Sequence, residues 1–287
     1  MSQEQLLARE EYVEQAYLFQ ALSERLSPAE PAQELLGYLR EEILTTTKLP
    51  LALDYLLAEL NHVGTMATAM SKLPHYFTPF QTFVVAAAED ERGRFQISTA
   101  MRVLTQEAKI RGEKSDPASL FFYQFETISR NRLDYDHGLE AMAGDPAYDA
   151  DWRQWILQVR HKIGMVTLAD LVYVHSRYYL IRQEQERAAE IQQPSPLLFG
   201  EKEGRIALAN RRKEPMFFFS ALQRQLNYPQ VPRPPKRDPA TDILPKLVRT
   251  MERLEVRLKL LEDEQRNKGI DLSQFFEKGD FPKPRDP

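Results

Sequence analysis

Two short segments of the chain, 59–62 and 134–137, place an acidic residue three positions before a histidine. On a helix, positions i and i+3 lie on one face, so each pair could present a carboxylate oxygen and an imidazole nitrogen to one metal ion. Di-iron carboxylate bundles use two such pairs together with one Glu from each of two further helices. The residues that would supply this ligand set are Glu14, Glu59, His62, Glu91, Asp134 and His137.

The second pair departs from that pattern. Asp134 stands where a Glu is usual, Gly138 follows the histidine directly, and a further predicted helix at 29–47 interrupts the four-helix order. A chain with 42 acidic residues also offers many such combinations by chance. A helical metal-binding protein using Glu59 and His62 is therefore kept as an alternative, and no cofactor is expected.

Other common chemical sites need residues that this sequence lacks. It contains no Cys, which excludes thiolate metal sites, disulfides and cysteine nucleophiles. It contains neither a GxxxxGK[ST] nor a GxGxxG segment, the two commonest nucleotide-binding patterns. No catalytic residue can be nominated, and we favour a non-catalytic protein.

The segment 205–237 combines cations with aromatic residues. Residues 201–240 contain nine Lys and Arg against four acidic residues, whereas residues 1–200 carry a net charge of −9. The run 211–213 is basic and the run 217–219 is three consecutive Phe, so the segment could neutralise phosphates and stack on bases. Neighbouring helical residues point ~100° apart, so the three rings cannot share one face. The simpler interpretation is that this segment docks on the acidic N-terminal helices, and nucleic-acid binding is only a second alternative.

The most regular apolar pattern of the chain lies at 241–268. Its spacings alternate between three and four, which is typical of the a and d positions of a coiled-coil heptad. The a and d residues are Leu244, Leu247, Met251, Leu254, Leu258 and Leu261. Arg257 falls at g and Glu262 at the following e, the two positions that meet across a parallel dimer. The expected partner is a second copy or another helical protein, although the helix could also fold back on its own body.

A proline-rich stretch joins the basic segment to the heptad helix. Five prolines lie between 227 and 239, and proline fixes the backbone in an extended form. A semi-rigid spacer at 228–240 is the favoured interpretation. The segment 232–237 also fits the PxxPxR form that polyproline-binding grooves recognise, but this form is short and arises often by chance.

The rest of the chain reads as a series of helices, and the predicted fold class is all-α. Helix N-terminal signals include the capping-box forms at 27–30 and 167–170 and prolines in first-turn positions. We predict helices at 3–26, 29–47, 50–72, 79–111, 117–131, 149–163, 168–191, 202–212 and 215–226, with a short helix and a turn within 132–148. The predicted organisation is a helical domain at 1–192, a basic aromatic docking segment at 193–227, the spacer, the heptad helix and a flexible tail at 269–287.

Composition agrees with a folded intracellular protein. Hydrophobic residues make up 43% of the chain and charged residues 28%, which is ordinary globular usage. Acidic residues begin at Glu4, where a signal peptide needs basic and then apolar residues, and the uncharged stretch 73–88 is too short to span a bilayer. The sequence therefore predicts a cytoplasmic interaction or scaffold protein that self-associates through its C-terminal heptad helix, without membrane association.

Overall fold

The computed structural model describes residues 7–26, 32–90, 95–186, 196–233 and 251. Within this part of the chain the fold is all-α, as predicted, with thirteen helices and no β-strand. The helices are α1 (Arg9–Arg25), α2 (Ala32–Glu42), α3 (Leu49–Val63), α4 (Met66–Ser71), α5 (Pro79–Glu89), α6 (Ile97–Gly112), α7 (Pro117–Asn131), α8 (Tyr135–Ala143), α9 (Ala150–Lys162), α10 (Leu168–Val174), α11 (Arg177–Gln185), α12 (Glu201–Ala209) and α13 (Pro215–Leu226).

Helices α7 and α13 have the predicted bounds, and α8 is the short helix expected before the turn at 144–146. Local signals explain this agreement. The Asp116 side chain accepts a hydrogen bond from the Ala118 amide and caps α7, which begins with Pro117. Arg132 then ends α7 in the left-handed region, with a φ of 56°. The predicted cap of α10 is also present, because the Thr167 side chain accepts from the Asp170 amide.

Three predicted helices are interrupted, so those predictions were wrong in extent. The helix predicted at 50–72 is divided by Gly64, whose φ of 80° ends α3 as a left-handed cap. The helix predicted at 79–111 ends at Glu89 in the structure, and α6 begins at Ile97. The helix predicted at 168–191 is divided at Ser176, which caps α11 and forms an isolated bridge with Phe199.

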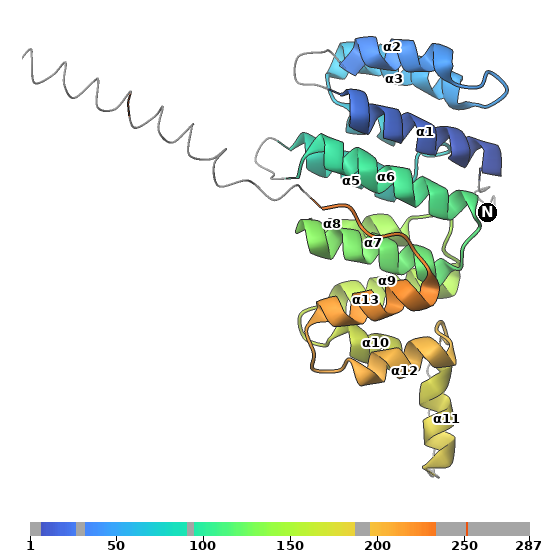
Figure 1. The fold of residues 1–287 in the computed structure, drawn as a ribbon, viewed down its shortest axis with the longest axis vertical. Coiled ribbons are helices and arrows are strands. Elements are labelled where there is room, and N and C mark those ends of the chain that lie inside the picture. Colours follow the sequence, from blue (N-terminus) through green and yellow to red (C-terminus); the bar gives the residue numbers. More distant parts are fainter. Residues whose placement is uncertain (1–6, 27–31, 91–94, 187–195, 234–250, 252–287) are drawn as a thin grey trace, which may run out of the picture. The chain divides into compact units, whose positions relative to one another are not determined.

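The helices of residues 7–233 lie in successive layers (Figure 1). Most contacts join helices that are neighbours in the sequence, such as α2 with α3, α5 with α6, α7 with α8, and α12 with α13. Helix α1 is the main exception, because it packs along α6 and so separates the α2–α3 layer from the α5–α6 layer. Helix α13 returns in the same way to pack on α7. These two contacts join helices that are far apart in the sequence.

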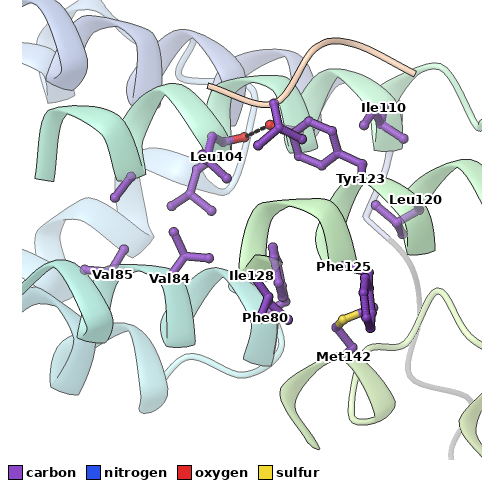
Figure 2. Close-up of a cluster of buried hydrophobic side chains, with 14 of the residues drawn as sticks. Phe80, Val84, Val85, Leu104, Ile110, Leu120, Tyr123, Phe125, Ile128 and Met142 are labelled. Carbon is purple, nitrogen blue, oxygen red and sulfur yellow. Dashed lines mark hydrogen bonds between the residues drawn. The ribbon is translucent and has the colours of Figure 1, made fainter. Parts of the chain in front are cut away.

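A single hydrophobic core runs through these layers. Figure 2 shows its central part, where Phe80 and Val84 of α5 point toward Leu104 of α6 and Ile128 of α7. The Tyr123 hydroxyl lies in this part of the core and donates to the Val103 carbonyl at 2.8 Å (Figure 2). Buried hydroxyls need such a partner, because an unpaired one costs about 1–3 kcal/mol.

Helix α13, which falls in the docking segment predicted at 193–227, contributes to this core. Phe218, Phe219 and Leu222 of α13 are buried in it, whereas Phe217 is 59% exposed. The three consecutive rings therefore divide between two faces of the helix, as the 100° spacing requires. Residues 1–234 form one compact unit and residues 235–287 a second.

The first residues of the segment predicted as a spacer at 228–240 belong to the first unit. Tyr228 and Val231 are buried. The carbonyl of Pro232 accepts from the Asn131 side chain at 3.3 Å, and that of Arg233 accepts from Arg102 at 3.4 Å. Residues 228–233 are thus fixed across α6 and α7, and we call them the strap. The remainder of the predicted spacer, 234–240, lies outside the described residues. In the described part of the chain, no helix has both the length and the apolar character that crossing a bilayer requires.

Candidate functional site

The first half of the predicted metal-ligand set occupies separate environments. Glu14 is buried on α1 and its Oε2 accepts from the Leu44 amide at 3.3 Å. Glu59 on α3 forms an ion pair with Lys72 at 2.5 Å, and hydrogen bonding to Lys72 lowers the pKa of Glu59. His62 is exposed at the end of the same helix. The carboxylates of Glu14 and Glu59 thus each have a partner within the protein.

The second acid–histidine pair is a helix cap at the surface. The Asp134 carboxylate accepts from the amides of Asp136 and His137 and so begins α8. Its other oxygen lies 2.9 Å from His137 Nδ1, and this hydrogen bond raises the pKa of His137. Glu91 lies outside the described residues. Among the residues that the structure does describe, no group of three or more His, Asp or Glu side chains could hold a metal ion.

The structure instead brings together a buried ionic cluster that the sequence analysis missed. Arg111 of α6 lies between Glu107 on its own helix and Asp145 in the turn after α8. The side chain of Arg111 is 2% exposed and both carboxylates are fully buried. Burial alone would lower the pKa of Arg111, but the two carboxylates raise it well above its usual value.

Neutral side chains complete the hydrogen bonds of this cluster. Gln124 of α7 donates to Glu107 at 3.1 Å and to Asp145 at 3.3 Å, while Gln81 of α5 donates to the second oxygen of Glu107 at 3.0 Å. The Tyr148 hydroxyl donates to Gln124 at 2.7 Å, and burial followed by the nearby Asp145 raises the pKa of that hydroxyl. With one cation and two carboxylates, the Glu107–Arg111–Asp145 cluster carries a formal charge of −1.

A line of polar contacts extends from this cluster to α1. Gln81 also donates to Gln15 at 3.2 Å, and Gln15 donates to the Tyr76 carbonyl at 3.1 Å. The Tyr76 hydroxyl donates to Glu11 at 2.9 Å, and Glu11 accepts from the Lys48 amide at 2.9 Å. Burial first, and then the charge of Glu11, raises the pKa of Tyr76. Since each member has a hydrogen-bond partner, this network fixes the register between α1, α5, α6 and α7.

A second buried pair anchors the strap. Glu126 of α7 pairs with Arg130 one turn later, and its other oxygen accepts from the Tyr228 hydroxyl at 2.7 Å. The same hydroxyl also lies 3.2 Å from the Phe219 carbonyl of α13. Burial, together with the charge of Glu126, raises the pKa of Tyr228. One hydroxyl thus links the strap to both helices.

Two cations of the predicted basic surface have intramolecular partners, although both side chains remain exposed. Arg211 pairs with Asp170 and lies over the Tyr173 ring at 5.5 Å. Arg205 pairs with Glu201 at 2.6 Å and lies over the Tyr178 ring, also at 5.5 Å. Each of these two charges therefore has a carboxylate and an aromatic ring of the protein as neighbours.

The next two cations lie at the edge of an apolar pocket. This pocket has a volume of about 300 Å³ and opens between the turn after α9, the start of α10 and the turn that joins α12 to α13. Its principal apolar walls are Phe125, Tyr135, Met165, Leu168, Phe218 and Phe219. Arg212 and Lys213 line it as well, and within the described part of the chain neither of them forms an ion pair. Pockets of this size are at the lower end of those that hold small ligands or single anchoring side chains.

Of the predicted heptad seam, the structure describes Met251, whose side chain is 61% exposed. The other interaction residues, Leu244, Leu247, Leu254, Arg257, Leu258, Leu261 and Glu262, lie outside the described residues.

Comparison with other proteins indicates neither a family nor a function for this chain. The chain matches no protein-family model, no curated protein and no solved structure.

Proposed function

We propose that this protein is an interaction or scaffold protein in which a rigid helical body is joined to a self-associating C-terminal helix. The observation that carries the proposal is the boundary of the compact unit at Pro234. The first unit ends seven residues before position 241, where the predicted heptad helix begins, and this division supports the proposal.

The anchoring of the strap supports this division. Tyr228 is held by Glu126, and the carbonyls of Pro232 and Arg233 accept hydrogen bonds from α7 and α6. Residues 228–233 are therefore fixed on the body, a few residues before the segment that we propose to self-associate.

The seam itself has the chemistry of a helix–helix interface. An a/d stripe of Leu and Met is narrow, and it buries well against one or two other helices of the same kind. The Arg257 and Glu262 positions would then favour parallel alignment.

The test is the oligomeric state of the full chain, measured by size-exclusion chromatography with light scattering. The wild type should be a dimer or a higher oligomer, and the double substitution Leu254→Asp with Leu258→Asp should give a monomer with unchanged helical content in the body. The matched control is Val256→Asp with Leu260→Asp, which places two carboxylates at the same spacing but outside the a and d positions. A monomeric wild type, or a control that dissociates as completely as the seam variant, would contradict the proposal.

A further inference from the structure

The pocket beside the α12–α13 turn continues into exposed apolar surface. Met165, which lines the pocket, is 79% exposed, and Val166 next to it is 38% exposed. A small molecule seated in about 300 Å³ would leave these side chains in water. A peptide could place one bulky side chain in the pocket and cover Met165 and Val166 with its neighbours.

The positive charge of the residues that line the pocket favours a peptide with acidic residues. Arg212 and Lys213 have no ion-pair partner among the described residues, whereas the preceding Arg211 is paired with Asp170. Arg212 adopts the left-handed backbone conformation, with a φ of 61°, within the turn that carries both cations. Carboxylates next to an apolar anchor would form charge-assisted hydrogen bonds with these two groups.

The same features disfavour a nucleic acid at this pocket. Residues 1–200 carry a net charge of −9, which repels an extended polyanion but has less effect on a short peptide with two or three carboxylates. The ring of Phe218 is 3% exposed and that of Phe219 is 2% exposed, so neither presents an open face on which a base could stack.

We propose that this pocket binds a segment of a partner protein in which a bulky apolar side chain lies next to acidic residues. The pocket belongs to the body and the heptad seam does not, so this activity goes beyond the proposed self-association and is independent of it. The exposed apolar part of the wall, Tyr135, Met165 and Val166, would contact the anchor. Arg212 and Lys213 would fix its carboxylate neighbours.

The experiment is selection of a displayed random dodecapeptide library on the immobilised full-length protein. Enriched peptides should combine a bulky apolar residue with flanking Asp or Glu. Their affinity, measured by fluorescence anisotropy, should fall at least ~10-fold in the double variant Arg212→Ala with Lys213→Ala, which corresponds to about 1.4 kcal/mol. Met165→Glu should weaken binding by a similar factor because it places a like charge beside the peptide carboxylates.

The matched control removes two cations of the same segment that do not line the pocket, Lys202→Ala with Arg205→Ala, and it should change affinity less than ~2-fold. All of these positions are exposed, so the variants should fold, and circular dichroism melts would verify this. Three results would each overturn the proposal. They are the absence of any enriched peptide, enrichment of peptides without acidic residues, and equal peptide binding by the wild type and the Arg212 and Lys213 variant. Binding of a single-stranded oligonucleotide that is lost in the Arg212 and Lys213 variant, with no peptide enriched, would replace the proposal with nucleic-acid recognition.

Discussion

The buried cluster around Arg111 gives the sharpest prediction about stability. Arg111 donates to Glu107 at 2.6 and 2.8 Å and to Asp145 at 3.1 Å, with a further bond to the second Asp145 oxygen. The substitution Arg111→Met keeps most of the side-chain volume but removes the cation. It leaves two fully buried carboxylates with neutral donors only.

Removing one partner from a buried ion pair costs about 3–5 kcal/mol, because the remaining charge stays desolvated. The whole unfolding free energy of a domain is about 5–15 kcal/mol, so the variant should fold but melt early. For a unit of this size, ~1 kcal/mol shifts the melting temperature by about 2–4 °C, and the expected loss is therefore about 6–20 °C.

Glu107→Gln is the informative comparison. It removes one of two carboxylates that share a single cation, so the cluster changes from a formal charge of −1 to neutral and Arg111 keeps Asp145 as its partner. Its cost should be about 1 kcal/mol, close to that of one imperfect hydrogen bond. Arg111→Met should thus cost at least ~2 kcal/mol more than Glu107→Gln, although both alter the same ion pair.

Urea unfolding followed by circular dichroism at neutral pH measures both variants. Two results would contradict the prediction: a loss of less than about 1 kcal/mol of unfolding free energy in Arg111→Met, or a loss in Glu107→Gln as large as that in Arg111→Met. Either result would show that the cation does not stabilise the body by compensating the two buried carboxylates.

Two further predictions concern the strap and a buried histidine. Tyr228→Phe removes the hydroxyl that bonds Glu126, so it should destabilise the body by about 1–3 kcal/mol and raise amide exchange in the strap; unchanged exchange would contradict the anchoring role. Burial lowers the pKa of His175 below its usual 6.5, while its Nδ1–H donates to the Pro196 carbonyl at 2.8 Å. The unfolded chain therefore binds the proton more tightly, and wild-type stability should fall as the pH drops below about 6.5. His175→Asn should remove that part of the slope, and parallel unfolding free energies of the wild type and His175→Asn from pH 7 to 5 would show the reasoning to be incorrect.

The sequence by itself determined the position of helices whose first residues include a capping side chain or a proline. Asp116 and Pro117 begin α7 at the predicted residue, and the Thr167 cap begins α10, because capping depends on side chains within three residues of each other. It also predicted that the three rings at 217–219 must divide between faces. The continuous helices predicted at 50–72, 79–111 and 168–191 were wrong in extent, because the hydrophobic pattern continues across the breaks. Ser176 caps α11, and its pairing with Phe199 is a contact that no local pattern contains.

Only the tertiary structure decided which polar residues meet. Glu107 and Arg111 are spaced as a helical ion pair, and the sequence gives no indication that they are buried or that Asp145 joins them from another layer. The pocket has the same origin, since its walls come from α7, the α9–α10 turn and α13. Local spacing determines which side chains share a helix face. Burial and charge pairing depend on which helix faces pack against one another. In this protein, the long-range packing of α1 on α6 and of α13 on α7 determines those pairs of faces.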